Sequence, residues 1–250
     1  MQAVYVLLLR DLKRFIRTKS RVFGSLGMPF FFLLFFSMGF RRASIPSLPE
    51  NISYIEFLTP GIISMVLLFT GTFSGVSIVW DRQFGFLREI LVAPISRMSI
   101  AVGRTLGGAI TALIQGIIML IASTLIGFRF NLTMLPIAIL IMLLIAIAFT
   151  ATGVAISTFM EDIHGFQIVV NFFVFPTFLL SGAIFPINEF PEFVKCLALL
   201  NPLTYGVDLL RFVFIGYSEI NPLSDLFVLV LYSFIILLLS SILFSRTEVK

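Results

Sequence analysis

The stretch from Thr133 to Phe159, TMLPIAILIMLLIAIAFTATGVAISTF, decides the fold, because it contains no charged residue. A helix of this length, rising about 1.5 Å per residue, exceeds the roughly 30 Å of a bilayer's hydrocarbon core. Leu, Ile, Phe and Val at mid-span each favour insertion by roughly 0.3–0.6 kcal/mol, whereas a charge there opposes it by about 2.5–3.5 kcal/mol. The stretch therefore predicts a membrane-spanning helix.

Comparable apolar runs lie on both sides of this stretch. We predict six spans, none with a charge at its centre, at residues 22–40, 58–80, 103–126, 133–159, 167–186 and 223–244. Of the 250 residues, 59% are apolar and 12% are charged, against roughly 45–50% and 25% in a soluble domain. This composition excludes a soluble enzyme, and we expect residues 1–250 to form one all-α transmembrane domain.

The basic residues indicate how the spans are oriented. With the N-terminus inside, twelve of the 17 Lys and Arg residues lie on the cytoplasmic side, in agreement with the positive-inside rule. We therefore expect a multi-pass protein of the cell (plasma) membrane, embedded in the lipid bilayer, with both termini in the cytoplasm. Cys196 is the only cysteine, so an internal disulfide is excluded.

Residues 1–21 combine an apolar face with a basic face at spacings of three and four, which is typical of an amphipathic helix at a membrane surface. The apolar face carries Val4, Leu8, Leu12 and Phe15, and the basic face carries Arg10, Lys13, Arg14, Arg17 and Arg21. A cleavable signal peptide is the alternative, but no small-x-small cleavage pattern follows Phe40.

Residues 187–222, which precede the last span, are divided by prolines into apolar pieces too short to cross a membrane. We expect two short helices here, near 192–200 and 203–216, on the outer side. Because non-helical backbone at membrane depth needs cover from protein or water, this segment is either interfacial or re-entrant.

The chain lacks the residue patterns of common catalytic and nucleotide-binding sites. It has one His and one Cys, and no Gly-x-x-x-x-Gly-Lys phosphate loop, His-Glu-x-x-His or Gly-x-Ser-x-Gly motif. Glu161, Asp162 and His164 would point in three directions on a helix, so we interpret them as a solvated loop and not as a metal site. We expect no catalytic site, no metal site and no nucleic-acid partner.

Away from their ends, the predicted spans offer only neutral polar side chains, such as Thr70, Gln115, Gln167 and Asn171, which we expect to hydrogen-bond between helices. Proton-coupled and ion-coupled transporters generally place ionisable groups inside the bilayer. If this chain moves a solute, we therefore expect the energy to come from another subunit.

Two pairs of glycines allow close approach of helices, because each pair is spaced four residues apart. They are Gly71 with Gly75, and Gly103 with Gly107. Either pair fits a contact between two copies of the chain or a contact inside one bundle, and we favour the latter.

The predicted cytoplasmic loop at residues 81–94 resembles a short amphipathic helix closed by Pro94. Phe84, Leu87 and Leu91 fall on one side of it at helical spacing. Such an apolar stripe lies against the membrane surface or fits a groove on a partner protein, and composition alone favours the membrane surface.

Three segments of the sequence carry a family resemblance. The first is the basic N-terminal helix running into the first span, from Arg10 to Phe40, and the second is the loop Asp81 to Pro94 followed by Ile95-Ser96-Arg97. The third is NPLTYGVDLLR, from Asn201 to Arg211. Together they resemble the permease subunits of type 2 ATP-binding-cassette (ABC) exporters, particularly the daunorubicin-resistance-like branch. Each segment alone is moderately specific. Their order and spacing around six spans extend the resemblance over nearly the whole chain.

The resemblance implies that residues 81–94 form a coupling helix that enters a cleft on a separate ABC ATPase. For ATPase coupling it implicates Asp81, Arg82, Phe84, Gly85, Leu87, Glu89, Leu91 and Pro94. Arg10, Lys13, Arg14 and Arg17 would lie on an interfacial helix that contacts the ATPase, and Asn201, Pro202, Tyr205, Asp208 and Arg211 would belong to an outer gate formed by residues 187–222. Gln83 is neutral, which leaves Asp81 and Glu89 for salt bridges to the ATPase.

The resemblance further implies a permease that works as a dimer, with an identical or a sister chain, and with two ATPase subunits. ATP and magnesium would bind to the ATPase, and this chain would bind no cofactor and catalyse no reaction itself. The lipid bilayer would surround the dimer.

The function implied is ATP-driven export of a hydrophobic or amphipathic compound, a drug or a lipid. A path lined by Phe, Leu, Ile and hydroxyl groups suits such a compound, because it offers no charge to replace an ion's hydration shell. Export of a polysaccharide or glycolipid is an alternative within the wider family, since aromatic rings also stack on sugars. An intramembrane lipid-modifying enzyme and a passive channel are alternatives from other classes, but we find neither converging ionisable groups nor a filter segment.

Overall fold

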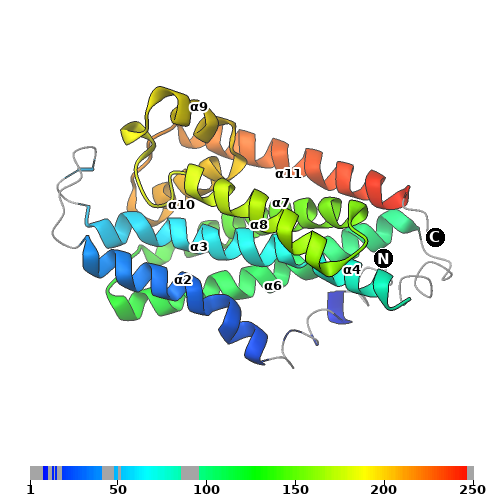
Figure 1. Cartoon of the computed structure of the whole chain (residues 1–250). Helices are drawn as coiled ribbons and strands as arrows, with labels where there is room; N and C mark the ends of the chain where they lie inside the picture. Colours follow the sequence, from blue (N-terminus) through cyan, green and yellow to red (C-terminus); the bar gives the residue numbers. More distant parts are fainter. Residues whose placement is uncertain are drawn as a thin grey trace.

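The computed structural model describes residues 8–10, 13, 15, 19–40, 48–49, 52–85 and 96–246. Over these residues every regular element is a helix and there is no strand, which confirms the all-α fold class. Most of the long helices lie roughly along one common axis (Figure 1). The structure within these ranges is therefore an elongated helical bundle.

The helices are α2 (Lys19–Gly39), α3 (Tyr54–Phe73), α4 (Val76–Gln83), α6 (Arg97–Ile126), α7 (Leu135–Phe159), α8 (Ile163–Leu180), α9 (Glu192–Leu200), α10 (Pro202–Ile215) and α11 (Pro222–Ser245). Two short 3-10 turns, Leu132–Met134 and Ile187–Glu189, precede α7 and α9. Following the expected orientation, we call the end with Gln83, Arg97 and Ser245 the inner end, and the end with α9 and α10 the outer end (Figure 1).

Within the described residues, five segments are long and apolar enough to cross a membrane: Tyr54–Gln83, Arg97–Ile126, Leu132–Phe159, Ile163–Leu180 and Pro222–Ser245. The protein is therefore a multi-pass membrane protein. The expected first span at 22–40 corresponds to α2, whose apolar part, Gly24–Gly39, is shorter than the other five. The expected fifth span at 167–186 differs at its end, because α8 stops at Leu180 and Gly182 turns the chain with φ 71°.

Asparagine and proline set the start of the two helices at the outer end. Asn201 and Asn221 each precede a proline, and each side chain accepts a hydrogen bond from the backbone N–H two residues on, at 3.0 and 2.9 Å. Pro202 and Pro222 then occupy the first helical position, where no backbone N–H is needed. The same Asn-Pro pair thus starts both α10 and α11.

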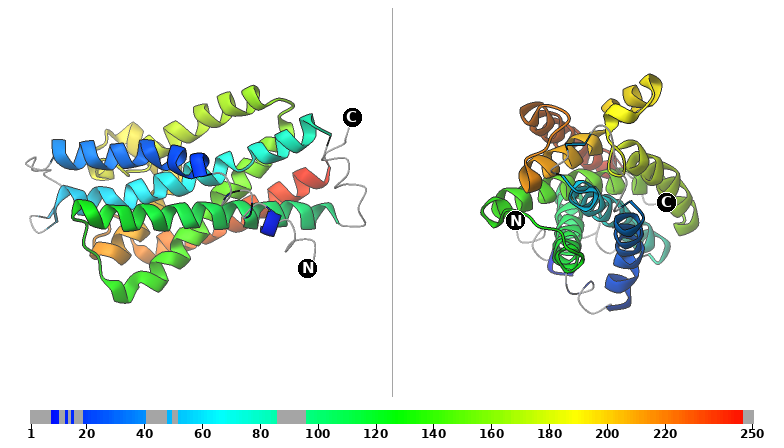
Figure 2. Two further views of the ribbon diagram at one scale, coloured as in Figure 1. Left: turned by 90° about the horizontal axis from the view of Figure 1, so that it is seen from below. Right: turned by 90° about the vertical axis from the view of Figure 1, so that its left-hand side faces the viewer.

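Helix α7 lies at the centre of the bundle and packs against α3, α6 and α11. Burial differs between the spans. Within an apolar stretch of 18 residues in each span, 67% of the residues are buried in Tyr54–Gln83, but only 22% are buried in α8. Seen end-on, α2 and α8 lie at the periphery (Figure 2). The core is therefore formed by α3 and α7, while α8 presents most of its surface outward.

Close approach of α3 and α4 to α7 depends on glycine. A methyl group at Gly75 would overlap the backbone carbonyl of Gly153, and one at Gly153 would overlap the carbonyl of Thr72. At Gly71 a methyl group would lie 3.0 Å from the Oγ1 of Thr150. Gly71 and Gly75 therefore pack against α7 of the same chain, which is the alternative that we favoured.

Polar side chains also connect the central helices. The Thr70 hydroxyl of α3 donates to the Oε1 of Gln115 on α6 at 2.6 Å. The hydroxyls of Thr152 on α7 and Tyr232 on α11 lie 2.9 Å apart. The expectation of hydrogen bonds between helices is thus confirmed for Thr70 and Gln115, whereas Gln167 and Asn171 are exposed on α8.

We predict that Gly153→Ala lowers the stability of the bundle, by about 1–3 kcal/mol, because the added methyl group overlaps backbone that cannot move freely. Gly27→Ala on α2 is the matched control, since a methyl group there meets nothing within 4 Å. Thermal unfolding of the detergent-purified chain, followed by circular dichroism, measures the difference. Equal melting temperatures for the two variants would contradict a close α3–α7 contact.

Candidate functional site

At the inner end, α4 presents an aromatic pair at the beginning of the expected coupling segment. The Phe84 side chain is 59% exposed, and its ring centroid lies 5.0 Å from that of Trp80. Gly85 follows with φ 80°, a backbone conformation that ends the helix. Of the remaining residues expected to couple to an ATPase, Leu87, Glu89, Leu91 and Pro94 lie outside the described residues.

Asp81 lies three residues before Phe84 but faces the interior. Its side chain is buried and forms ion pairs with Arg104 of α6 and with Arg10, whose Nη2 lies 3.1 Å from the Asp81 Oδ1. In this structure Arg10 and Arg104 therefore bind the carboxylate that we expected to be available to a partner protein. Arg10 belongs to the expected interfacial helix, of which Lys13 is exposed and Arg14 and Arg17 lie outside the described residues.

Arg82, the next residue in the chain, contacts α7 and not α6. Its Nη1 donates to the backbone carbonyl of Met160 at 2.7 Å and lies 3.4 Å from that of Thr158. Both carbonyls are at the end of α7, where the helix leaves backbone acceptors without intrahelical partners. The last turn of α4 is therefore connected on one side to α6 and Arg10, and on the other to α7.

At the outer end, residues from the expected gate build a sharp corner. The helices α9 and α10 meet at 86°. The Asn201 Nδ2 donates to the carbonyl of Thr177 on α8 at 2.6 Å, while the hydroxyls of Thr204 and Tyr205 donate to the carbonyls of Ala198 and Leu199, both at 2.6 Å. The motif Asn-Pro-Leu-Thr-Tyr thus closes the corner by capping α10 and satisfying the carbonyls at the end of α9.

Asp208 holds the loop between α10 and α11. Its buried carboxylate accepts hydrogen bonds from the Ser218 hydroxyl at 2.8 Å, from the backbone N–H of Glu219 at 3.0 Å and from that of Ile220 at 2.9 Å. Three donors from one loop thus converge on a single side chain of α10. Asp208 is therefore an anchor for residues 216–221.

Arg211, which is completely buried, connects three parts of the outer end. Its guanidinium donates to the carbonyls of Phe57 at 3.1 Å and Gly182 at 2.5 Å, and lies 3.6 Å from the centroid of the Phe57 ring. Its Nη1 forms an ion pair with the Glu219 Oε1 at 3.5 Å, too long for a well-formed hydrogen bond. Burial raises the pKa of the Glu219 carboxyl, and the Arg211 charge opposes that shift.

Sequence reasoning missed three residues that the structure brings into these clusters: Arg104, Glu219 and Asp225. Asp225 is buried in the first turn of α11, beside Asp208, and neither of its carboxylate oxygens has a hydrogen-bond donor among the described residues. Its position in the predicted last span was the available signal, because a carboxyl at the edge of an apolar helix needs a polar partner. We have no signal that would have paired Arg104 with Asp81.

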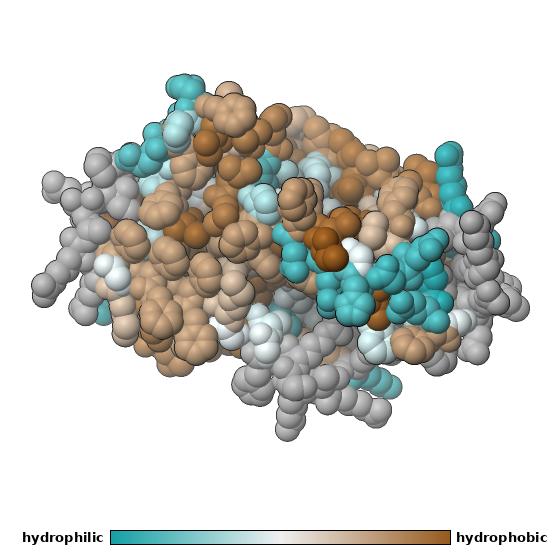
Figure 3. Space-filling model, in the orientation of Figure 1, coloured by the Kyte–Doolittle hydropathy of each residue, from teal (hydrophilic) through white to brown (hydrophobic). Residues whose placement is uncertain are grey.

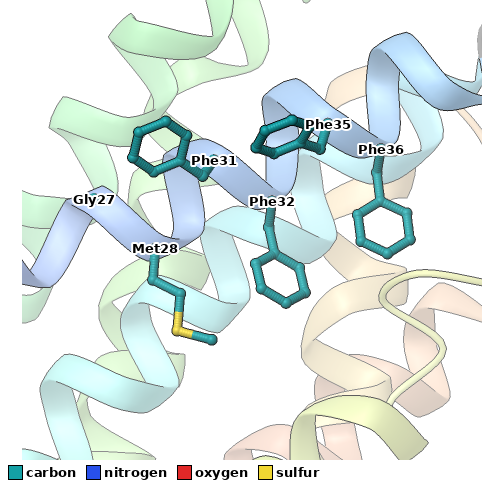
Figure 4. Close-up of a pocket in the computed structure, with 6 residues that line it drawn as sticks. All are labelled: Gly27, Met28, Phe31, Phe32, Phe35 and Phe36. Atoms are coloured by element: carbon teal, nitrogen blue, oxygen red, sulfur yellow. The ribbon is translucent and has the colours of Figure 1, made fainter.

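A hollow on α2 is lined entirely by glycine, methionine and phenylalanine. It has a volume of about 510 Å³ and is lined by Gly27, Met28, Phe31, Phe32, Phe35 and Phe36. Figure 4 shows the four phenylalanine rings projecting from successive turns of one helix, in two rows. The volume lies within the range of pockets for drug-sized ligands, and Met adapts its shape to different ligands.

Metal ligands are not gathered in the part of the chain that the structure describes. No group of three or more His, Cys, Asp or Glu side chains there could hold a metal ion. The two charged clusters, one at each end, instead consist of internal ion pairs and hydrogen bonds. Their arrangement connects helices to one another.

The sequence profile of the ABC-2 type transporter family matches residues 2–215. The chain belongs to this family. Among its relatives, the transport permease ycf38 of Porphyra purpurea is 31% identical over 79% of this chain and 69% of its own length. The doxorubicin resistance ABC transporter permease protein DrrC of Mycobacterium tuberculosis (strain ATCC 25618 / H37Rv) is 26% identical over 88% and 79%, and the inner membrane transport permease YadH of Escherichia coli (strain K12) is 25% identical over 89% and 87%.

Membership of the ABC-2 type transporter family agrees with the membrane-spanning helices described above. The chain is a transport permease, and the resemblance seen in the three sequence segments is confirmed. Relatives in this family are permease subunits of ABC transporters. Their role is consistent with a transport subunit that has no catalytic centre of its own. The two charged clusters of this ABC-2 permease agree with such a role, because they connect helices.

We predict that Arg211→Gln destabilises the outer end of this ABC-2 permease. Removing one partner of a buried pair costs about 3–5 kcal/mol, because the other charge is left uncompensated. Proteolysis of the purified chain should therefore accelerate within residues 181–221, and the melting temperature should fall. Lys195→Gln, which removes an exposed charge on α9, is the control and should change neither; unchanged proteolysis of the Arg211 variant would rule out its role as an anchor.

Proposed function

We propose that the chain is the permease subunit of an ATP-driven exporter that moves a hydrophobic or amphipathic compound, a drug or a lipid, out of the cytoplasm. Membership of the ABC-2 type transporter family is the observation that carries this proposal. The chain has no phosphate loop, so ATP and magnesium would bind to separate ABC ATPase subunits. The complex would hydrolyse ATP in the cell membrane, while this chain would bind no cofactor.

The inner end offers a surface for such an ATPase. Phe84 is exposed where α4 ends, and Trp80 supports its ring. Burying a Phe side chain in a groove contributes about 1.5–3 kcal/mol, whereas an exposed ion pair contributes roughly 0–1 kcal/mol. We therefore assign docking to Phe84 together with Leu87 and Leu91 of the same loop.

A second permease chain would complete the transport path along α8. Gln167 and Asn171 lie about one turn apart on this helix and are exposed, although most of the helix is apolar. Hydrophilic colour extends inward from the end near α4, over the part of the surface where α8 lies (Figure 3). Polar groups facing hydrocarbon are unfavourable, so this strip fits a contact with a second chain or a path between two chains.

The character of the transported compound follows from the apolar hollow on α2. The hollow on α2 is lined by phenylalanine and methionine, which bind aromatic or aliphatic groups and offer no charge. The name of the relative DrrC refers to doxorubicin resistance. Doxorubicin, which has a planar aromatic part and an amino sugar, is accordingly a suitable probe.

Passage outward would require the outer end to open. The corner between α9 and α10, held by Asn201, Pro202 and Tyr205, lies over this end, and Asp208 and Arg211 attach it to the bundle. In the proposed cycle, closure of the ATPase dimer displaces α4, and the helices rearrange until this corner separates. The outer gate would consist of residues 187–222.

We predict ATP-dependent uptake of doxorubicin by inside-out vesicles that contain the chain and its cognate ABC ATPase. Uptake should require hydrolysable ATP, because the permease itself has no energy source. Candidate ATPases from the same genome can be co-produced one at a time and tested for copurification with the tagged permease. Uptake driven by a proton gradient without ATP would overturn the proposed function.

Phe84→Asp should abolish ATPase copurification and ATP-dependent uptake, because it places a charge in an apolar contact. Phe84→Leu keeps the apolar character and should retain most of both. Met98→Asp is the matched control, since Met98 is also an exposed apolar side chain at the inner end. If Phe84→Asp bound the ATPase as well as the unchanged chain does, docking through this loop would be wrong.

A cysteine at Asn171 tests the second chain. In a Cys196→Ser background, Asn171→Cys should form a disulfide-linked or reagent-linked dimer in membranes, because the two polar strips would face each other. Phe227→Cys, on the exposed face of α11, should remain monomeric under the same conditions. Equal cross-linking at both positions would indicate random collision and would refute a dimer along α8.

A further inference from the structure

The end of α4 is attached to its surroundings through two adjacent charged residues. Apart from these residues, α4 packs mainly against α7 and α8. The Asp81 carboxylate instead forms ion pairs with Arg104 on α6 and with Arg10. The ion pairs of Asp81 therefore link α4 laterally to α6 and to the N-terminal segment.

Burial distinguishes these ion pairs from ordinary surface pairs. The Asp81 and Arg104 side chains are 4% and 2% exposed, whereas Arg10 is 40% exposed. A buried ion pair gains little net stability over an apolar contact of the same volume, because both charges lose their water. Its best-supported use is to fix one arrangement of neighbouring elements, since any displacement leaves a charge without its partner.

Arg82 makes the complementary connection. It binds the carbonyls of Met160 and Thr158 at the end of α7, just before α8 begins. Because Asp81 and Arg82 are neighbours, a rotation or shift at the end of α4 acts on both connections together. Phe84, the exposed residue assigned to docking, is only one turn further on.

We propose that Asp81 and Arg82 are positioning residues that transmit displacement of the docked loop into the bundle, and that neither contacts the ATPase. Asp81 transmits it to α6 and to the N-terminal interfacial helix through Arg104 and Arg10. Arg82 transmits it to the junction of α7 and α8. This assignment rests on the proposed function, and it reverses the expectation that Asp81 forms a salt bridge with the ATPase.

The N-terminal connection can be tested on the permease alone, in inside-out vesicles. Trypsin cleaves after the basic residues of the interfacial helix, so its cleavage rate reports how firmly Arg10 holds that helix. Arg10→Gln should accelerate cleavage about fivefold, as expected for loss of one partly exposed ion pair. Asp81→Asn should accelerate it at least as much, because it also removes the ion pair with Arg104. The double variant should be no faster than Asp81→Asn alone, because Asp81→Asn already removes the bond to Arg10.

Three variants separate this connection from other effects. Glu161→Gln removes an exposed carboxylate at the same end and should leave cleavage unchanged. Asp81→Glu keeps the charge and should restore most of the protection. Arg82→Gln should leave the N-terminal helix protected, because its bonds are to the α7 end.

The role in transmission is tested with the ATPase present. Asp81→Asn and Arg82→Gln should bind the ATPase and hydrolyse ATP normally, yet take up less doxorubicin per ATP hydrolysed. Loss of ATPase binding in Asp81→Asn would show that Asp81 is a docking residue and would overturn the proposal, as would trypsin cleavage equal to that of the unchanged chain. If no ATPase binds even the unchanged chain, the proposed function fails, while the trypsin experiment still decides the attachment of the N-terminal helix.

Discussion

The structure depends on the fact that lipid offers no hydrogen bonds to the polypeptide. Every backbone group at membrane depth must then be satisfied internally, which explains why helices are the only regular elements of the described residues. The same constraint explains where the charged side chains lie. Arg211 binds carbonyls of the α3 and α8 ends at the outer side, and Arg82 binds carbonyls of the α7 end at the inner side. At the carboxyl ends of α7 and α8 these guanidinium groups meet backbone carbonyls that lack intrahelical partners.

The two charged ends share one helical element. The segment Tyr54–Gln83, formed by α3 and α4, runs from the outer to the inner end. Arg211 binds it near the outer end through the Phe57 carbonyl, and Asp81 and Arg82 hold its inner end. Close packing at Gly75 and Gly153 joins the same element to the central helix α7. A displacement at the inner end therefore has a direct physical route to the outer corner, which is what the proposed transport cycle requires.

Sequence patterns predicted the helices better than the contacts between them. Apolar runs identify membrane helices because insertion depends on the sum of side-chain transfer energies, which composition records. The short helices α9 and α10 could be anticipated because Pro191 and Pro202 interrupt the apolar pattern. The pairing of Asp81 with Arg104 could not be anticipated, because it depends on how α4 and α6 are rotated about their axes. A charged residue beside an apolar stripe looks equally suitable for solvent, a partner or the bundle interior.

The peripheral helices show why one chain is an incomplete unit in the proposed mechanism. A helix that is apolar all round fits lipid on every face, but α8 carries Gln167 and Asn171 on its exposed surface. The hollow on α2 lies on another peripheral helix. A single bundle would leave the polar strip against hydrocarbon, whereas a second chain would enclose it beside apolar surface. Enclosure would give an amphipathic compound both polar and apolar contacts. The same polar groups that destabilise an isolated chain in lipid would then favour assembly of two chains and line the transport path.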